Sequence, residues 1–337
     1  MPARRIRVAL PWLQASLAQA SAQEALPALD ALRWLAGRGR IAGGDSRAWR
    51  DWLLAEPGAP DTRPLQRWPA GPALAALAGF TAEAGHGSWC VAQPVHLAVG
   101  LDHLRLAPLA QAALDEQAAG ELSATVQAHF GTDAFSLVGL VAGAWLLRFN
   151  APLACTTWPP DAVVGHNVHD FLPSGPAGAY VRSLMNEIQM LLHEHPLNQR
   201  RERSRLLPVN AWWLWGFGKT PQDASLVQCA HWDLNSDDPW LRGLWHTQGI
   251  AARDVAQVLT TAPRRDSLIA LSQPPASPDG ESLVAVDAGL LSWACTQLRA
   301  GAVERLELLL GEAVVRVEGA ARFQFWRRPA RLADLLP

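Results

Sequence analysis

The sequence predicts an α/β protein whose core sheet, flanked by helices, is interrupted by an inserted α+β domain. Two observations carry this prediction: strands and helices alternate near both ends of the chain, while the middle reads strand–strand–helix–strand–strand–helix with short turns. We expect the core to comprise residues 1–85 and 209–337 and the inserted domain to comprise residues 86–208. The 337 residues, 49% apolar and 18% charged, amount to about two average domains.

The first predicted element is a buried strand over Ile6–Leu10. A secretory leader is the alternative, since arginines precede this apolar run, but Arg7, Pro11 and Gln14 interrupt the stretch that a leader requires. Three helices are predicted to follow, over residues 23–38 and 45–54 and up to about residue 78.

The inserted domain is predicted to hold strands at 89–93, 104–106 and within 135–148, and helices over 115–130 and 176–195. The second part of the core opens with a strand over Ala211–Trp215, which Gly216-Phe217-Gly218 ends. Its remaining elements are strands near 226–229 and at 267–271, helices within 240–259 and over 289–299, and three short strands between 305 and 326.

Composition excludes several classes of partner. A net charge of −2 and an isoelectric point near 6.6 lack the electrostatic signature of a protein that binds nucleic acid or anionic membranes. The longest apolar stretch, Leu137–Leu147, is about half the length of a membrane-spanning helix. Four cysteines more than 60 residues apart, with no CxxC pair, favour free thiols in a cytoplasmic protein. We therefore expect no nucleic acid, no membrane and no cofactor.

Two histidines lie near the end of the helix predicted over 176–195. His193 and His195 are two residues apart, so on a helix they point in nearly opposite directions and cannot bind one metal ion together. Their alternative role is to interact with the partial negative charge of the helix end. The arginine-rich residues 200–205 that follow form either an anion site or a solvated surface loop.

Other candidate motifs are incomplete. Gly218-Lys219-Thr220 follows an apolar strand but lacks the earlier glycine of a phosphate-binding loop, because Trp213 occupies that position. His231 and Asp233 lie near Asp237-Asp238-Pro239, which is more typical of a helix N-terminus with an aspartate cap. The sequence contains no G-x-S-x-G elbow, no H-E-x-x-H and no G-x-G-x-x-G.

A stretch around residues 186–218 resembles a known family. His195–Arg201, Pro208-Val209-Asn210 and Gly216-Phe217-Gly218 resemble the H-P-x-N-x-x-R, P-x-N and R-G-x-G motifs of the archaeal-type cofactor-independent phosphoglycerate mutases. Residues 26–40 are similar to the T-P-N-L-D-x-L…G helix of the same family. Residues 186–196 together with Trp213–Gly216 resemble the RpfE-type regulatory proteins, a distant branch of the mutase group.

The resemblance implies an alkaline-phosphatase-like core with an inserted domain. The mutases place a metal-binding Asp-Gly just after the first strand, whereas this chain has Leu10-Pro11-Trp12 there. Their nucleophilic serine lies in a G-S-D segment, whereas Gly43-Gly44-Asp45-Ser46 places serine after the aspartate. Their late His and Asp ligand motifs have no counterpart beyond residue 220. We therefore expect no bound metal and cannot name a catalytic residue.

The resemblance leaves a candidate ligand-binding set in which Asn198, Arg201 and Asn210 would lie beside the strand end at Trp215-Gly216. The full set is His193, His195, Asn198, Arg201, Asn210, Trp215, Gly216 and Gly218. Trp213 and Trp215 share one face of the strand and either floor a pocket or fill the layer between sheet and helices.

Three functional hypotheses follow. The first is a non-catalytic, mutase-like regulatory protein that binds a small anionic ligand or a protein partner. The second is a metal-dependent phosphomutase or phosphatase with rearranged ligands, namely Asp45, Ser46, His231 and Asp233. The third is a structural scaffold whose Trp-rich region forms an interface.

Overall fold

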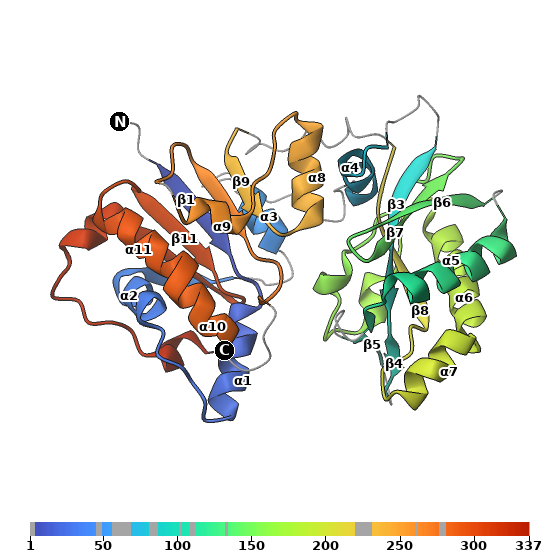
Figure 1. The fold of residues 1–337 in the computed structure, drawn as a ribbon, viewed down its shortest axis with the longest axis horizontal. Helices are drawn as coiled ribbons and strands as arrows, with labels where there is room; N and C mark the ends of the chain where they lie inside the picture. Colours follow the sequence, from blue (N-terminus) through green and yellow to red (C-terminus); the bar gives the residue numbers. More distant parts are fainter. Residues whose placement is uncertain are drawn as a thin grey trace. The chain divides into compact units, whose positions relative to one another are not determined.

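The computed structural model describes residues 4–44, 49–55, 69–80, 87–100, 103–107, 112–131, 134–219, 231–260, 262–275 and 281–336. The chain divides into two compact units (Figure 1). Unit 1 comprises residues 1–62, 228–245 and 250–337, and unit 2 comprises residues 63–227 and 246–249. In the described parts of both units, no helix is at once long enough and apolar enough to cross a bilayer.

Unit 1 is built on a six-stranded sheet, sheet A, with the strand order β2-β12-β11-β1-β10-β9. Its strands are β1 (Arg5–Ala9), β2 (Arg40–Gly43), β9 (Asp233–Ser236), β10 (Ser267–Ala270), β11 (Arg305–Leu309) and β12 (Ala313–Glu318). The four strands β9, β10, β1 and β11 run parallel, whereas β12 and β2 are antiparallel to their neighbours. The carboxyl ends of β1, β9 and β10 therefore meet at one edge of the sheet.

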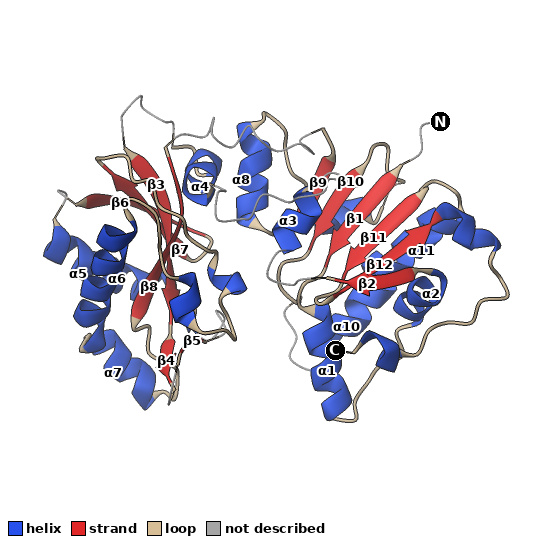
Figure 2. Ribbon diagram, turned by 180° about the vertical axis from the view of Figure 1, so that it is seen from behind, coloured by secondary structure: helices blue, strands red, loops and turns tan. Residues whose placement is uncertain are grey.

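Helices cover one face of sheet A (Figure 2). They are α1 (Leu13–Ala22), α2 (Asp30–Arg38), α10 (Glu281–Val286) and α11 (Ser292–Arg299), with a π-helical turn at Asp287–Leu291 between the last two. Ile6 and Val8 of β1 are buried in the core beneath these helices. Asp287 accepts hydrogen bonds from the main-chain N–H groups of Ala31 (3.1 Å) and Leu32 (2.7 Å) and so caps α2. Three further helices of the described chain are α3 (Trp49–Leu54), α8 (Pro239–Thr247) and α9 (Val255–Val258).

A buried charge cluster lies on the opposite face of β1. Arg7 lies between Ile6 and Val8 in the strand, so its side chain points to the other face of the sheet. Its Nε donates to Glu307 Oε2 over 2.8 Å. Glu307 is 2% exposed and also accepts from Arg316 Nε over 2.6 Å. Burial alone would raise the pKa of Glu307, but the charges and hydrogen bonds of the two arginines outweigh it and lower the pKa. Arg7 also donates to the carbonyls of Trp52 in α3 and of Ala55 just after it, which ties the end of that helix to the sheet.

Several element boundaries differ from the predictions. The helix expected over 23–38 begins only at Asp30, because Pro27 disfavours helical backbone at and before its position. A separate helix, α1, occupies Leu13–Ala22, where no helix was predicted. The expected third strand of the C-terminal segment is instead a 3₁₀ turn at Gly319–Phe323. The strand predicted near 226–229 lies outside the described residues.

Unit 2 contains a four-stranded antiparallel sheet, sheet B, with the order β6-β7-β3-β8. Its strands are β3 (Ser88–Val95), β6 (Phe135–Val141), β7 (Ala144–Phe149) and β8 (Ala211–Gly218), and a ribbon of β4 (Leu97–Val99) and β5 (Leu104–Leu106) extends from it. The helices α5 (Glu116–Phe130) and α6 (Gly178–His193) pack on one face, with α7 (Pro196–Arg203) after α6 (Figure 1). Helix α4 (Ala70–Leu77) packs against β3, β7 and β8.

Unit 2 extends beyond the predicted limits of 86–208 at both ends. It reaches residue 227 because β8 pairs with β3, from Val95↔Ala211 to Trp89↔Gly218. It begins at residue 63 because α4 packs against these two strands. The strand predicted to open the second part of the core is therefore an edge strand of sheet B.

Glycines allow α4 to approach sheet B closely. A Cβ at Gly71 of α4 would lie 2.7 Å from the backbone N and Cα of Cys90 on β3. A Cβ at Gly216 of β8 would lie 2.5 Å from the Cβ of Ala70, and Gly216 has a φ of +69°. Both contacts are shorter than real side chains tolerate, so these positions require glycine.

Candidate functional site

The predicted ligand-binding residues lie in unit 2 but do not form one site. Asn210 precedes the first residue of β8, whereas Gly216 and Gly218 lie at its other end. At about 3.3 Å per strand residue, Asn210 and Gly216 are roughly 20 Å apart. The expected cluster of Asn198, Arg201 and Asn210 beside Trp215-Gly216 is therefore wrong, because these three residues surround the opposite end of the strand.

The two asparagines hold main-chain segments together. The Nδ2 of Asn198 donates to the carbonyls of Leu192 (2.8 Å) and Val209 (2.9 Å), and its Oδ1 accepts from the N–H of Val209 (2.8 Å). The Oδ1 of Asn210 accepts from the N–H of Leu97 (2.7 Å), and its Nδ2 donates to the carbonyl of Leu97 (2.9 Å). Both side-chain amides thus supply hydrogen-bond partners to buried or half-buried main-chain N–H and C=O groups.

Arg201 has a similar structural role. Its side chain is 8% exposed, its Nε donates to the carbonyl of Leu207 (2.7 Å), and its Nη1 donates to the carbonyl of Ala113 (3.0 Å). Burial lowers the pKa of this guanidinium, and Asp115 partly opposes the shift. The arginine run begins on α7, where Arg200 pairs with Glu121, rather than in a surface loop.

The two histidines have different environments. His193 is exposed at the last position of α6, whereas His195 is 8% exposed and caps α7. The Nδ1 of His195 accepts from the N–H of Leu197 (3.1 Å), and its Nε2 lies 2.9 Å from Thr125 Oγ1. Because Nδ1 is an acceptor, the neutral ring must carry its proton on Nε2. Burial lowers the pKa of His195, an effect that Glu121 opposes and Arg200 reinforces.

His195 is expected to make the protein less stable in mild acid. A folded pKa below the unfolded value of 6.5 gives stability that is complete above pH 6.5 and is lost as the pH falls towards the folded pKa. We expect the decrease in melting temperature between pH 7.5 and pH 5.0 to be smaller in His195→Asn than in the wild type. His193→Asn is the matched control and should retain the wild-type decrease. If the melting temperature of both variants fell by the same amount between pH 7.5 and pH 5.0, this role of His195 would be contradicted.

The indoles of the Trp-rich strand pack against other described elements of unit 2. Trp213 donates its indole N–H to the carbonyl of Trp158 (2.8 Å), and Trp212 stacks on Trp145 with 4.2 Å between ring centroids. The indole nitrogen of Trp215 is buried and has no hydrogen-bond partner among the described residues. Gly216 donates its N–H to Thr157 Oγ1 (3.0 Å). A Cβ at Gly218 would overlap Pro69, so Gly216 and Gly218 serve the approach of α4.

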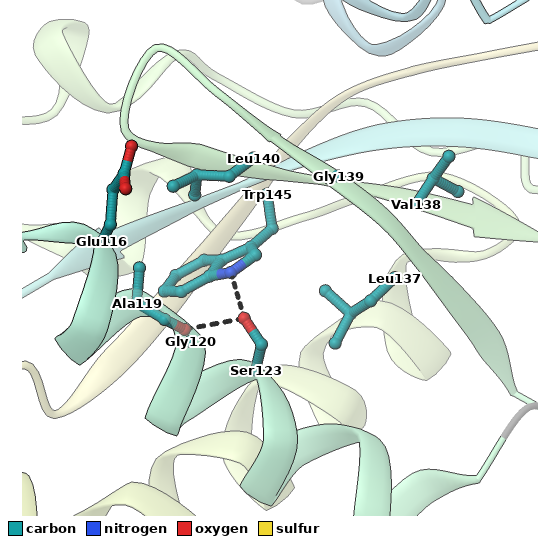
Figure 3. A pocket seen from close by; sticks show the side chains of 9 residues that line it. All are labelled: Glu116, Ala119, Gly120, Ser123, Leu137, Val138, Gly139, Leu140 and Trp145. Atoms are coloured by element: carbon teal, nitrogen blue, oxygen red, sulfur yellow. Dashed lines mark hydrogen bonds between the residues drawn. The ribbon is translucent and has the colours of Figure 1, made fainter.

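A small cleft in unit 2 lies between α5 and the β6–β7 hairpin (Figure 3). Its volume is about 280 Å³, and its floor is the indole of Trp145. The indole N–H donates to Ser123 Oγ (2.6 Å), and this hydroxyl donates to the carbonyl of Ala119 (2.7 Å). Glu116 is the one charged residue in the described lining. An apolar cleft with a carboxylate at its rim is unsuited to an anion.

A second polar cluster lies in unit 1, at the edge where the parallel strands of sheet A end. Asp238 follows β9, and its Oδ1 accepts from the N–H of Leu241 (2.8 Å), so it caps α8 as predicted. Its Oδ2 accepts from Arg50 Nη2 (2.7 Å) and Nε (3.2 Å). Arg50 and Asp238 are 7% and 2% exposed. The ion pair is therefore buried and bound through two guanidinium nitrogens.

Aromatic side chains surround this ion pair and the adjacent loop. The guanidinium of Arg50 lies 4.3 Å from the ring centroid of Trp49 and 5.5 Å from that of Trp240. Trp12, just after β1, donates its indole N–H to the carbonyl of Leu271 (2.9 Å). Asp237 Oδ1 accepts from the N–H of Ser272 (2.8 Å). Burial raises the pKa of this carboxyl group, the hydrogen bond from Ser272 opposes the shift, and the charge of Asp238 adds to it. Sequence reasoning identified Asp238 as a cap but missed Arg50, whose partner is 188 residues away.

The residues at this edge do not fit the metal ions that the mutase resemblance implies. The first strand is followed by Leu10, Pro11 and Trp12, which supply no carboxylate, and Arg50 already neutralises Asp238. Among the described residues, no group of three or more His, Cys, Asp or Glu side chains is placed to hold a metal.

Only half of the rearranged ligand set lies within the described residues. Asp45 and Ser46 lie outside the described residues. His231 and Asp233 lie at the start of β9, at the opposite end of that strand from Asp238. His231 Nε2 accepts from the indole of Trp232 (3.0 Å), and Asp233 lies 3.8 Å from Arg253.

Comparison with known proteins shows distant homology to one enzyme family over part of the chain. No protein-family model matches the sequence. A probable 2,3-bisphosphoglycerate-independent phosphoglycerate mutase of Geobacter sulfurreducens is 35% identical over 106 residues, which are 31% of this chain and 27% of that protein. The 2,3-bisphosphoglycerate-independent phosphoglycerate mutase of Methanosarcina barkeri is 27% identical over 128 residues, which are 37% of this chain and 32% of that protein. The chain thus matches less than a third of the length of each relative.

The fold has a counterpart among solved structures. The PH0037 protein from Pyrococcus horikoshii superposes with a TM-score of 0.50 at 12% identity, covering 98% of this chain and 92% of that one. This similarity concerns the fold alone. The predicted fold class, a mixed α/β protein with a central sheet flanked by helices, is confirmed.

Proposed function

We propose that this chain, a distant homologue of the 2,3-bisphosphoglycerate-independent phosphoglycerate mutases over part of its length, is a non-catalytic regulatory protein that binds a protein partner. The resemblance of residues 186–218 to the RpfE-type regulatory proteins supports this role. The described cysteines, Cys90, Cys155 and Cys295, are free thiols, and in keeping with this we place the protein in the bacterial cytoplasm.

The observation that carries the proposal is the buried Arg50–Asp238 ion pair at the carboxyl edge of sheet A. Metal-assisted phosphoryl transfer requires several anionic ligands that face the metal ions and the transferred group. Here a fixed guanidinium neutralises Asp238, and Trp12 occupies the loop after β1. A divalent cation placed beside Arg50 would be repelled at short range.

The described residues favour a protein partner over a small anionic ligand. Asn198, Arg201 and Asn210, the expected anion contacts, satisfy main-chain groups instead. The cleft above Trp145 presents a carboxylate rather than a cation. The metal-dependent alternative gains no support, because His231 and Asp233 lie away from the carboxyl edge.

The proposal predicts that the natively purified chain contains no stoichiometric metal and does not interconvert 3-phosphoglycerate and 2-phosphoglycerate with Mn²⁺ or Mg²⁺. Elemental analysis and a coupled assay, with an active phosphoglycerate mutase as the positive control, measure both. Two metal ions per chain together with turnover would overturn the proposal. A rise in melting temperature with 3-phosphoglycerate alone would show a small anionic ligand instead of the partner.

A further inference from the structure

We propose that residues 322–328, together with Trp34, Arg38 and Arg299, form a docking surface for an acidic protein segment that also carries apolar side chains. We call these residues the aromatic–arginine surface; they lie in unit 1, around the C-terminal ends of α2 and α11. The inference rests on the proposed partner-binding role. Its test is separate, because metal content and phosphoglycerate turnover do not report on this surface.

Three large aromatic side chains in this short segment are exposed to solvent. Phe323, Phe325 and Trp326 are 62%, 85% and 67% exposed. The rings of Phe325 and Trp326 pack edge to face, with centroids 5.2 Å apart and an interplanar angle of 84°. Isolated exposed apolar residues are common, but adjacent exposed rings form a patch typical of interaction sites.

Arginines lie within this segment and over the nearby Trp34, and no carboxylate pairs with them within the described residues. Arg38 and Arg299 lie over the ring of Trp34, each guanidinium 4.6 Å from its centroid. Arg322 lies over Phe323, and Arg327 and Arg328 follow Trp326 directly. Burial lowers the pKa of Arg38, and the neighbouring charges of Arg299 and Arg327 add to this shift, so the arginines repel one another.

The segment is held against α2, so the surface exists before any partner binds. The main-chain N–H of Ala330 donates to the carbonyl of Arg33 (2.9 Å), and Arg33 Nε donates to the carbonyl of Ala330 (3.2 Å). Arg327 Nη1 reaches the carbonyls of Gly37 (3.5 Å) and Arg38 (3.4 Å) at the end of α2. A preorganised surface loses less conformational entropy on binding.

The charges and ring geometry favour an acidic protein segment over nucleic acid or a membrane. The whole chain carries a net charge of −2, so an extended polyanion would meet a negative surface beyond this patch. Single-stranded nucleic acid stacks successive bases on open ring faces, whereas two guanidiniums lie over Trp34 and the Phe325 and Trp326 rings contact each other. Acidic groups would pair with the arginines, and apolar side chains would cover the exposed rings.

Fluorescence anisotropy with the full chain tests the surface. The probe is a labelled twelve-residue peptide of Asp, Glu, Leu and Phe, and we expect it to bind in the micromolar range and to weaken as salt rises. The double variants R327E/R328E and F325A/W326A should each weaken binding at least about tenfold, or about 1.4 kcal/mol. R264E/R265E, a second exposed arginine pair in unit 1, should leave affinity within about twofold, as expected for a site outside the surface.

Other ligands and folding controls complete the experiment. A peptide with Lys in place of the acidic residues should not bind. Melting temperatures close to that of the wild type would show that the double variants fold. We expect this result because the main-chain hydrogen bond between Ala330 and Arg33 still holds the segment when Arg327 is replaced. The inference is overturned if the acidic peptide does not bind, or if the two surface variants bind it as tightly as the wild type. Variant-sensitive binding of oligo-dT or phosphatidylserine vesicles at equal or higher affinity would also overturn it.

Discussion

Replacing Glu307 with alanine is expected to lower the free energy of unfolding by about 3–5 kcal/mol, the usual effect of removing one partner of a buried ion pair. Glu307 is 2% exposed and is the described carboxylate that faces both Arg7 and Arg316. Its loss would leave the Arg7 guanidinium, 6% exposed, without the carboxylate with which it pairs in the described part of the chain. Urea denaturation of both proteins at pH 7 measures the difference.

A second, exposed ion pair between β11 and β12 offers a matched control. Glu318 pairs with Arg305 across the same two strands, β11 and β12, but its side chain is 51% exposed. Glu318→Ala should therefore change stability by less than about 1 kcal/mol. The lowered pKa of Glu307 means that its contribution is complete above the unfolded value near 4.5 and is lost as the pH falls below it. The difference in free energy of unfolding between the wild type and Glu307→Ala should accordingly become smaller below pH 4.5. A difference that does not change with pH would contradict the argument that the charge of Glu307 stabilises the fold.

Gly71→Ala is expected to destabilise the protein by about 3 kcal/mol, although alanine favours helices more than glycine does. The added methyl group would lie 2.7 Å from the backbone of Cys90, which cannot move without distorting β3. A shift of α4 would in turn disturb the contact between Ala70 and Gly216. Thermal and urea unfolding of the variant measure this effect.

Gly120→Ala is the matched substitution, because Gly120 also lies within a helix of unit 2. A Cβ there would meet no described atom within 4 Å apart from the backbone of its own helix and its chain neighbours. This variant should be stabilised by up to about 1 kcal/mol through helix propensity alone. We expect Gly71→Ala to lower the free energy of unfolding and Gly120→Ala to raise it. If both substitutions raised it, α4 would not approach β3 as closely as described.

Local patterns predicted most elements of the fold correctly. The strand β1 follows from its apolar run, and α5 follows from the cap at Asp115, whose Oδ1 accepts from the N–H of Ala118, and from the ending at Gly131. Helix α7 was missed because charged residues dominate it, and its Pro196 and the His195 cap became informative only with the structure. The domain limits were misplaced because the pairing of β8 with β3 joins residues more than 100 positions apart.

The candidate site could be predicted only in part. Asn198, Arg201 and Asn210 have the side chains of ligand-binding residues, and nothing in their local sequence distinguishes an amide that binds a ligand from one that binds backbone. The side chain of Asn210 forms hydrogen bonds with the main chain of Leu97, 113 positions away. Arg50 forms an ion pair with Asp238, 188 positions away. Such partners are set by tertiary packing, which periodicity and motifs do not encode.

The position of β1 in sheet A has a consequence for the order of events during synthesis. This strand is synthesised long before both of its neighbours, β10 and β11, and Arg5 binds Asp266, which lies 261 positions later in the chain. All strands of sheet B lie between residues 88 and 218, so unit 2 can complete its sheet while unit 1 is still without most of its strands. While unit 2 is being translated, β1 therefore has neither of its partner strands, and its apolar side chains stay outside the core that they later join.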